Sequence, residues 1–383
     1  MRIGHFVSVF PAQRKNVQVY GVGRVVYHLC EQLSKMGHRV RVFAPFKENF
    51  VEKKNNLSVH FYNSQLKIGV MNVSYKLFFD PLNYPLDIIH VHNDTPISVI
   101  AGLRCAMKRG KPLVVTWHGD WIPNYGHIVR RIGVYLSNKF LVKKILSKAD
   151  VIVTPSIYYV QQSRFLMKYT DKLIEIPNGI NLQDFNIPYS KDECRKILGI
   201  DESKDIVLFV GGLYPLKGPH ILLKAVPKIV KSHRNAFFIF VGGGDLSGYE
   251  RLATKLGVRQ YVKFTGYVKE ERKLLYYGVS DIFVLPSIEA FEVFPLVLLE
   301  ASANGLPIVT SDLETFKCLI ENGYNGLFTK RGDAENLADA IIYLLENDDL
   351  RERMGRNAKE KVKAYSWEKI AEKYEEVYQR LVK

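Results

Sequence analysis

Short runs rich in β-branched and aromatic residues alternate with stretches of helical periodicity along most of this chain. In the first half these runs lie at residues 2–10, 39–45, 87–92, 112–119, 150–156 and 173–179, and in the second half at 206–212, 236–244, 262–267, 281–287 and 307–312. Strands that alternate with helices predict a parallel sheet with crossover helices on its faces. Because the alternation occurs twice, the sequence predicts an α/β fold of two doubly wound, Rossmann-like domains.

The length of 383 residues also favours two domains, since single cores stop growing at roughly 250 to 300 residues. A polar segment that contains a proline, residues 185–203, separates the two sets of strands. We therefore expect an N-terminal domain over 1–185 and a C-terminal domain over 186–365. Residues 366–383 predict a charged amphipathic helix whose partner the sequence leaves open, the N-terminal domain being one candidate.

Nearly all of the net positive charge of the chain, +15, lies in its first half. Residues 1–185 hold 25 Lys and Arg against 11 Asp and Glu, whereas residues 186–383 hold 29 against 28. A basic half suits an acidic partner, such as a phosphorylated acceptor, an anionic membrane or a nucleic acid, or is a solvated face without a partner. No nucleic-acid-binding motif is recognised, so nucleic acid is not the expected partner.

One segment of this basic half, residues 122–148, mixes cationic and apolar side chains at helical spacing. Its cations are Arg130, Arg131, Lys139, Lys143, Lys144 and Lys148. It is either a basic amphipathic helix at a membrane surface or an ordinary helix whose lysines snorkel from the sheet. No apolar run reaches the ~18 residues that span a bilayer, and the opening strand is followed by no signal cleavage site. We expect a cytoplasmic protein, with peripheral contact at the inner membrane face as the added hypothesis.

The four cysteines form no CxxC pair and no Cys/His ligand spacing, so neither a zinc site nor a disulfide framework is expected.

Two glutamates, Glu292 and Glu300, bracket seven mostly apolar residues directly after the run 281–287. At ~1.5 Å rise per residue their carboxylates lie up to about 12 Å apart, too far to flank one glycosidic bond as acid and base. The two carboxylates are instead placed to bind the two ends of one elongated polar ligand. Pro295 fits the first position of the helix, where the free N–H groups of Leu296 and Val297 would favour a phosphate. The simpler alternative is a buried helix whose first glutamate caps it.

Glycine-rich loops follow three of the predicted strands. In GGLYPLKG, residues 211–218, Lys217 suits a departing phosphate, although lysines are common in surface loops. In the loop at 19–26, Gly21 and Gly23 allow a ligand close to the backbone. That loop lacks the third glycine and the downstream acid of the dinucleotide fingerprint, which disfavours a nicotinamide cofactor. The third loop is Gly242 to Gly244.

Histidines end two of the predicted strands in the first half. His118, in VVTWHGDW, would face the ligand crevice of a doubly wound domain and hydrogen-bond a sugar hydroxyl or a phosphate, although a lone histidine is more often a packing residue. His90 and His92 are weaker candidates. No spacing suggests a metal site.

Together these features resemble the retaining GT-B fold glycosyltransferases of family 4 (glycosyl transferases group 1), over nearly the whole chain. The landmarks are the loop with Gly21 and Gly23, the turn MGHRV, WHG with His118, PNGINLQDF, GGLYPLKG, VGGG, FTGYV, VLPS, the two spaced glutamates, NGLPIV, NGYNG and the final SWEKIA. The resemblance implies two domains that face each other across a cleft. It also implies metal-independent hexosyl transfer from a nucleotide-diphosphate sugar to a hydroxyl acceptor, with no cofactor and no protein nucleophile. An anionic or lipid-linked acceptor is the added hypothesis for this chain.

The resemblance also implies roles for particular residues. His118 and Glu292 would contact the transferred sugar, Lys217 would hold the diphosphate, and Glu300 would bind the ribose. The remaining donor-binding candidates are Gly21, Gly23, Gly212, Gly266, Tyr267, Phe294, Leu296 and Val297.

The chain departs from the family pattern at several positions of the phosphate site. Gly212 stands where an arginine is usual, Pro295 replaces a glycine, and Glu314 with Thr315 replaces a glycine pair, followed by Cys318 in place of an acid. Arg14, Lys15 or Arg24 would be substitute cations. Two alternatives follow: a binding module for an anionic partner, and a nucleotide-sugar epimerase.

Overall fold

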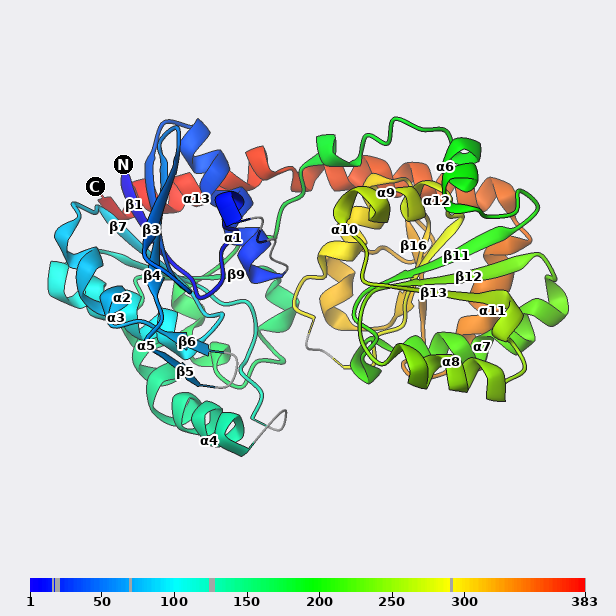
Figure 1. Cartoon of the computed structure of the whole chain (residues 1–383), viewed down its shortest axis with the longest axis horizontal. Helices are drawn as coiled ribbons and strands as arrows, with labels where there is room; N and C mark the ends of the chain where they lie inside the picture. Colours follow the sequence, from blue (N-terminus) through cyan, green and yellow to red (C-terminus); the bar gives the residue numbers. More distant parts are fainter. Residues whose placement is uncertain (16, 18–20, 69–70, 124–127, 290–291, 383) are drawn as a thin grey trace. The chain divides into compact units, whose positions relative to one another are not determined.

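The computed structural model describes the chain except residues 16, 18–20, 69–70, 124–127, 290–291 and 383. It divides into two compact units, Met1–Gly179 with Trp367–Lys383, and Ile180–Ser366 (Figure 1). The second unit thus begins six residues before the expected boundary at 186. The last helix, α13 (Trp367–Val382), belongs to the first unit.

The first unit is built on an eight-stranded sheet with the order β10-β9-β8-β7-β1-β2-β4-β3. All neighbours are parallel except β3 and β4. The strands are β1 Arg2–Phe6, β2 Arg39–Phe46, β3 Phe50–Lys54, β4 Leu57–Asn63, β7 Ile88–His92, β8 Leu113–Thr116, β9 Val151–Thr154 and β10 Leu173–Glu175. The antiparallel edge of β3 and β4 was not predicted. A separate hairpin pairs β5 (Leu66–Ile68) with β6 (Met71–Val73).

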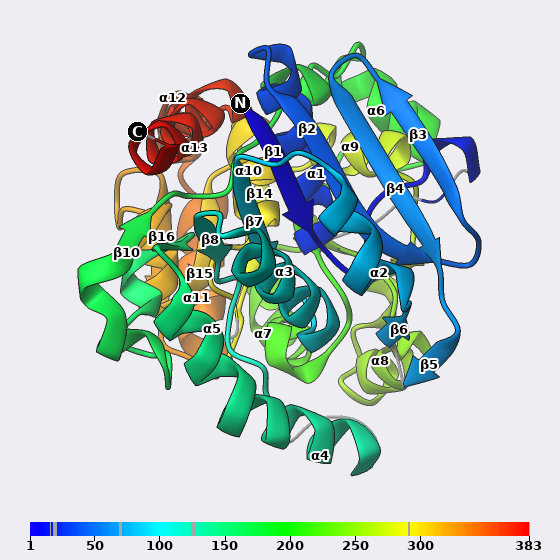
Figure 2. The same cartoon turned by 90° about the vertical axis from the view of Figure 1, so that its left-hand side faces the viewer.

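Helices cover both faces of this sheet (Figure 2). They are α1 Val22–Lys35, α2 Lys76–Phe79, α3 Pro96–Arg109, α4 Ile128–Leu136, α5 Lys143–Lys148 and α13, with a π-helical turn at Ser137–Val142. Side chains alternate between the faces of a strand. On β7, Val91 faces Gly102 of α3, where a Cβ would come within 2.2 Å of it, while His90 faces Tyr378 of α13. The sheet is therefore buried between two helical layers.

The helix α13 closes the first unit at the point where the chain leaves and returns. Its first residue, Trp367, is buried against Gly179, where a Cβ would lie 2.5 Å from the indole ring. His38 Nε2 lies 2.9 Å from Glu375 Oε1, and the ring of His28 stacks on Trp367.

The second unit has a six-stranded, wholly parallel sheet of order β13-β12-β11-β14-β15-β16. Its strands are β11 Asp205–Val210, β12 Ala236–Val241, β13 Val262–Gly266, β14 Ile282–Leu285, β15 Ile308–Ser311 and β16 Gly326–Thr329. Its helices are α6 Lys191–Leu198, α7 Pro219–Ser232, α8 Leu246–Lys255, α9 Glu270–Gly278, α10 Leu296–Ala303, α11 Ala334–Leu345 and α12 Asp348–Lys361. The strands are almost fully buried, as parallel strands covered on both faces are.

Candidate active site

In the second unit, the loops that follow β11, β12, β13 and β14 are bound to one another at the carboxyl edge of the sheet. The N–H of Gly242 donates to Gly266 O (3.0 Å) and the N–H of Ile288 donates to Leu216 O (2.9 Å). A Cβ at Gly242 would lie 1.9 Å from Gly211 O, so only glycine allows these loops to approach. This edge is where open α/β sheets bind ligands.

Lys217 and Glu292 meet at this edge, although 75 residues separate them in the chain. Lys217 ends a short 3₁₀ turn, Pro215–Lys217, and its Nζ forms an ion pair with Glu292 Oε1. The other carboxylate oxygen, Oε2, accepts a hydrogen bond of 2.8 Å from Ser287 Oγ. The Lys217 side chain remains 27% exposed. An incoming anion could therefore compete with Glu292 for this cation.

Glu300 lies deeper than the sequence suggested. It is 3% exposed, and its carboxylate accepts hydrogen bonds from Lys273 Nζ (3.0 Å to Oε1) and the Tyr277 hydroxyl (2.9 Å to Oε2). Lys273 also pairs with Glu270 at 2.9 Å. A ribose ligand would share this carboxylate with two side chains of α9.

The start of α10 differs by one position from the prediction. Pro295 is the N-cap, with extended backbone (φ −75°, ψ 117°), and the helix begins at Leu296. The expectation that Pro295 occupies the first helical position was therefore wrong. Leu296 and Val297 are the first two helical residues, half-buried, and their N–H groups precede the first intrahelical hydrogen bonds. Phe294 is buried, with its ring 5.8 Å from that of Tyr365.

The remaining donor-binding candidates of this unit lie on the same edge. At Gly212 a Cβ would lie 2.3 Å from the Tyr214 ring, so an arginine there would require this tyrosine to move. Gly266 has φ +68°, a conformation that favours glycine, and Tyr267 next to it is exposed.

The segment with Glu314 forms a short 3₁₀ turn, Glu314–Cys318. Glu314 pairs with Lys317 at 2.6 Å, so part of its charge is balanced within the turn. Cys318 Sγ donates to Thr315 O at 2.8 Å.

The two glycines predicted in the first unit open α1. Gly21 is the N-cap with φ +57°, and no described atom lies within 4 Å of a Cβ placed on it. Gly23 is buried within the first turn. Gly21 thus has a conformational reason to be glycine, whereas the residues before it, 18–20, lie outside the described part of the chain.

His118 follows β8 on a braced loop. Its N–H donates to Asn93 Oδ1 (2.6 Å), whose Nδ2 donates to Gly119 O (2.8 Å). The indole N–H of Trp117 donates to Asp120 Oδ1 (2.9 Å). His118 is half-buried, and desolvation lowers its pKa to about 3, so the ring is neutral at pH 7.

Several residues of these sites were missed by the sequence reasoning. His92 was a weak candidate, yet its Nδ1 lies 3.1 Å from His118 Nε2. His5, on β1, contacts His92 and was not considered. Lys273 and Tyr277 hold Glu300; their spacing of four residues on a predicted helix was the available signal.

Comparison with known proteins gives the family. The model for glycosyl transferases group 1 matches residues 190–361, and that for glycosyltransferase family 4 matches residues 19–184. An uncharacterised glycosyltransferase of Methanocaldococcus jannaschii is 36% identical over 76% of this chain and 75% of its own length. This chain belongs to the group 1, family 4 glycosyltransferases. It is an enzyme of that class, as predicted.

Two further similarities extend over all or nearly all of the chain. The phosphatidyl-myo-inositol mannosyltransferase of Mycobacterium leprae is 28% identical over 94% of this chain and 92% of its own. The structure of the Anabaena protein HepE in complex with UDP-glucose covers 100% of both chains with a TM-score of 0.76 at 20% identity. This likeness confirms the predicted GT-B fold class, with two parallel-sheet domains. Among the described residues of the glycosyltransferase, no helix is long and apolar enough to cross a bilayer.

Proposed function

We propose that this glycosyltransferase moves a hexose from a nucleotide-diphosphate sugar to a hydroxyl acceptor, with retention at the anomeric carbon and without a metal ion. The observation that carries the proposal is the ion pair of Lys217 and Glu292 at the carboxyl edge of the second sheet. An ammonium held there can neutralise the charge that develops on a departing diphosphate. HepE, which shares the fold, was solved with UDP-glucose, and this supports a nucleotide-sugar donor.

Each side chain at this edge then has a part in binding the donor. The diphosphate replaces Glu292 as the ion-pair partner of Lys217 and accepts hydrogen bonds from the N–H groups of Leu296 and Val297. Glu292, still held by Ser287, accepts from a hydroxyl of the hexose. Glu300, fixed by α9, accepts from the ribose.

The transfer itself uses no covalent intermediate with the protein. The acceptor oxygen bonds to the anomeric carbon on the face that the diphosphate leaves, and the carbon–oxygen bond to the diphosphate breaks. The acceptor proton passes to the departing phosphate oxygen. Lys217 and the start of α10 supply fixed positive charge during this step.

The test is a transfer assay with UDP-, GDP- and ADP-linked hexoses in the presence of EDTA, with the anomer of the product determined by NMR. Lys217→Ala should lower kcat/KM at least about 100-fold, as loss of one transition-state donor does. Lys231→Ala, an exposed lysine of α7, is the matched control and should keep full activity.

The alternatives appear as other outcomes of this assay. An inverted product, or transfer only with added divalent metal, would refute the mechanism. Nucleotide binding without turnover would favour the binding module, and isomerisation of the donor without acceptor would favour an epimerase.

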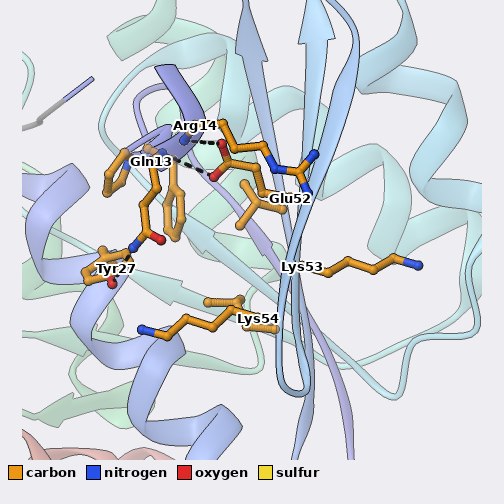
Figure 3. Close-up of a pocket in the computed structure, with 10 residues that line it drawn as sticks. Gln13, Arg14, Tyr27, Glu52, Lys53 and Lys54 are labelled. Atoms are coloured by element: carbon orange, nitrogen blue, oxygen red, sulfur yellow. Dashed lines mark hydrogen bonds between the residues drawn. The ribbon is translucent and has the colours of Figure 1, made fainter. Parts of the chain in front are cut away.

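We further propose that the acceptor carries an anionic group, which a pocket of the first unit would receive. Figure 3 shows this pocket between Tyr27 of α1, the turn at Gln13 and Arg14, and Glu52 of β3. Glu52 accepts from the N–H groups of Gln13 (3.2 Å) and Arg14 (2.9 Å), which fixes the wall. Lys54, whose Nζ pairs with Glu31 Oε1 at 2.7 Å, adds a cation to the lining that an anionic ligand would have to share with Glu31. The M. leprae relative, named for a phosphatidylinositol substrate, supports an acceptor of this kind.

A pair of acceptors that differ in charge tests this second proposal. Arg14→Ala should raise KM for phosphatidylinositol about tenfold, the effect of one lost charge-assisted hydrogen bond, and leave KM for uncharged diacylglycerol unchanged. Arg39→Ala, an exposed arginine of β2, is the control. Equal KM changes for both acceptors would contradict the assignment.

Peripheral membrane contact belongs to the same proposal. In α4 and the π-helical turn after it, Ile128, Val129, Ile132, Tyr135, Leu136 and Phe140 are exposed large apolar residues. Their spacing places them on one face of the helix, and Arg131, Lys139, Lys143 and Lys144 are exposed beside them. An exposed apolar face edged by cations suits an anionic bilayer surface at the cytoplasmic side.

Co-sedimentation with vesicles tests this contact. The protein should bind phosphatidylcholine vesicles that contain phosphatidylglycerol, less at high salt, and Phe140→Ser should weaken binding severalfold. Tyr343→Ser removes a similarly exposed aromatic residue from α11 and should have no effect. Equal binding of wild type and Phe140→Ser would reject the helix as the contact.

A further inference from the structure

Four histidines lie together at the carboxyl edge of the first sheet. His5 of β1 and His90 of β7 are register partners, His92 follows two residues later on the same face, and His118 comes after the next strand. Successive ring centroids are 4.8 Å (His5 to His90), 4.3 Å (His90 to His92) and 5.3 Å (His92 to His118) apart. Their separation along the sequence concealed this cluster.

Three of the four form a hydrogen-bonded chain. His118 Nε2 lies 3.1 Å from His92 Nδ1, and His92 Nε2 lies 3.1 Å from His5 Nδ1. At the inner end, His5 Nε2 is fully buried and has no partner among the described residues. At the outer end, Nδ1 of the half-buried His118 has no hydrogen-bond partner in the described part of the chain and lies where a ligand could reach it.

The fourth histidine stands outside this chain. His90 Nδ1 lies 2.7 Å from the Tyr378 hydroxyl and Nε2 lies 2.7 Å from Thr116 Oγ1, so both of its nitrogens are engaged. His5, His90 and His92 also offer nitrogens within 4.8 Å of one another, close enough for a metal ion. A metal would have to break hydrogen bonds of His90 and His92, so the observed contacts fit neutral, hydrogen-bonded rings better.

The number of N–H protons on His5, His92 and His118 allows only two arrangements of their hydrogen bonds. Burial lowers the pKa of His5 and His118 to about 3 and that of His92 well below its ordinary value, so each ring is neutral and carries one N–H. Two of the three N–H groups lie within the two hydrogen bonds. The third therefore lies at one end, on His5 Nε2 or on His118 Nδ1.

The buried end decides between them. A proton on His5 Nε2 would be a buried N–H donor without an acceptor, and such orphan donors are rarer in proteins than acceptors that lack a donor. With His5 Nε2 bare, His5 Nδ1–H donates to His92 Nε2, and His92 Nδ1–H donates to His118 Nε2. His118 then carries its proton on Nδ1.

We propose that His92 and His5 are positioning residues that fix the tautomer of His118, so that Nδ1–H of His118 is presented to the substrate as a hydrogen-bond donor. The inference rests on the proposed transfer function and on a contact of His118 with the transferred sugar, which the family resemblance implies. His118 in this state donates to a sugar or phosphate oxygen and accepts no proton through Nδ1.

Nitrogen NMR of protein with ¹⁵N-labelled histidine reads the tautomer directly and without turnover. The wild type at pH 7 should show His118 protonated on Nδ1. Protonation of His118 on Nε2, or on both nitrogens, would overturn the proposal, even if transfer activity is as proposed. One equivalent of tightly bound zinc in the purified protein would overturn it as well.

Two variants test the direction of the chain. His92→Leu removes the partner of His118 Nε2, so the Nε2–H form of His118 should appear and kcat/KM should fall about tenfold, the loss of one hydrogen bond of about 1.4 kcal/mol. His5→Asp places a carboxylate oxygen as an acceptor for His92 Nε2–H, which reverses both hydrogen bonds and should move the proton of His118 to Nε2. If the tautomer of His118 is unchanged in both variants, the assigned direction of the hydrogen bonds between the histidines is refuted.

His60→Leu is the matched control. His60 lies on β4 of the same sheet, is 7% exposed, and its Nε2 also has no partner in the described structure. It takes no part in the hydrogen bonds that link His5, His92 and His118. The control should leave the tautomer of His118 and kcat/KM unchanged. A tautomer change there would show that any buried substitution disturbs His118 and would contradict the assigned roles.

Discussion

Removing Lys273 should destabilise the second unit strongly, because it would leave Glu300 buried without its cation. The side chains of Lys273 and Glu300 are 11% and 4% exposed, and their charged atoms lie 3.0 Å apart. At an effective dielectric constant of 20, two unit charges at that distance attract by about 5.5 kcal/mol. Of the two donors to Glu300 described above, Lys273 and Tyr277, only the Tyr277 hydroxyl would remain. Breaking such a buried pair typically costs about 3 to 5 kcal/mol.

Urea unfolding of the full chain, followed by circular dichroism, measures this cost in Lys273→Met. Because the protein has two units, each transition should be fitted separately, and only the transition of the second unit should shift. Lys273→Met combined with Glu300→Leu removes both charges and should recover much of the loss, since a hydrophobic pair can replace a buried ion pair.

Lys228→Met is the control for the loss of a lysine. Lys228 is also paired, with Glu335 and Asp339, but on the solvent-exposed surface. Its removal should barely move the transition. If Lys273→Met shifts the midpoint no more than Lys228→Met, the argument from burial is refuted.

Three further predictions use other features of the structure. Gly218→Ala should destabilise the second unit more than Gly257→Ala: both glycines have φ +70°, but only at Gly218 would a Cβ meet Pro286 O, at 1.9 Å, and equal losses in thermal unfolding would show that backbone strain alone matters. Acid should destabilise the first unit as the pH falls below about 6.5, because burial lowers the pKa of His60 to about 4 and only the unfolded chain takes up the proton. In His60→Gln the free energy of unfolding should depend less on pH, and the loss of stability between pH 7 and pH 4 should be smaller by up to about 3 kcal/mol. Glu292→Gln should remove the carboxylate that competes for Lys217 and so raise the affinity of the protein for a nucleotide diphosphate, which calorimetry with UDP would measure. Weaker UDP binding would contradict the competition between carboxylate and phosphate.

The alternation of strands and helices was enough to predict two doubly wound sheets, because fully buried parallel strands read as continuous apolar runs. The edge strand β3 and its antiparallel pairing with β4 escaped prediction, since FVEKK in β3 is mostly polar and lacks that signature. The Lys217 loop and Glu292 could be named from local patterns. Their pairing could not, because it depends on how the loops after β11 and β14 bond to each other.

Residues that act through tertiary neighbours were the main omission. His5 has no local feature that distinguishes it from a packing histidine, and its meaning comes only from the register of β1 with β7. Glu300 was predicted to bind a ribose, but its contacts with Lys273 and Tyr277, 27 and 23 residues away, were not foreseen.

The return of α13 to the first unit sets the order in which the two units can be completed during synthesis. The second unit, residues 180–366, is continuous and has all of its strands once it leaves the ribosome. The first unit lacks the partners of His38 Nε2 and His90 Nδ1 until Glu375 and Tyr378 have been made. Although N-terminal domains usually fold first, here the amino-terminal unit is completed only by the last helix, and the part of the sheet around β7 that α13 covers stays exposed in the meantime. A fragment that ends at residue 179 would leave His90 of the sheet, and His28 and Cys30 of α1, without the cover of α13 and open to solvent and chaperones.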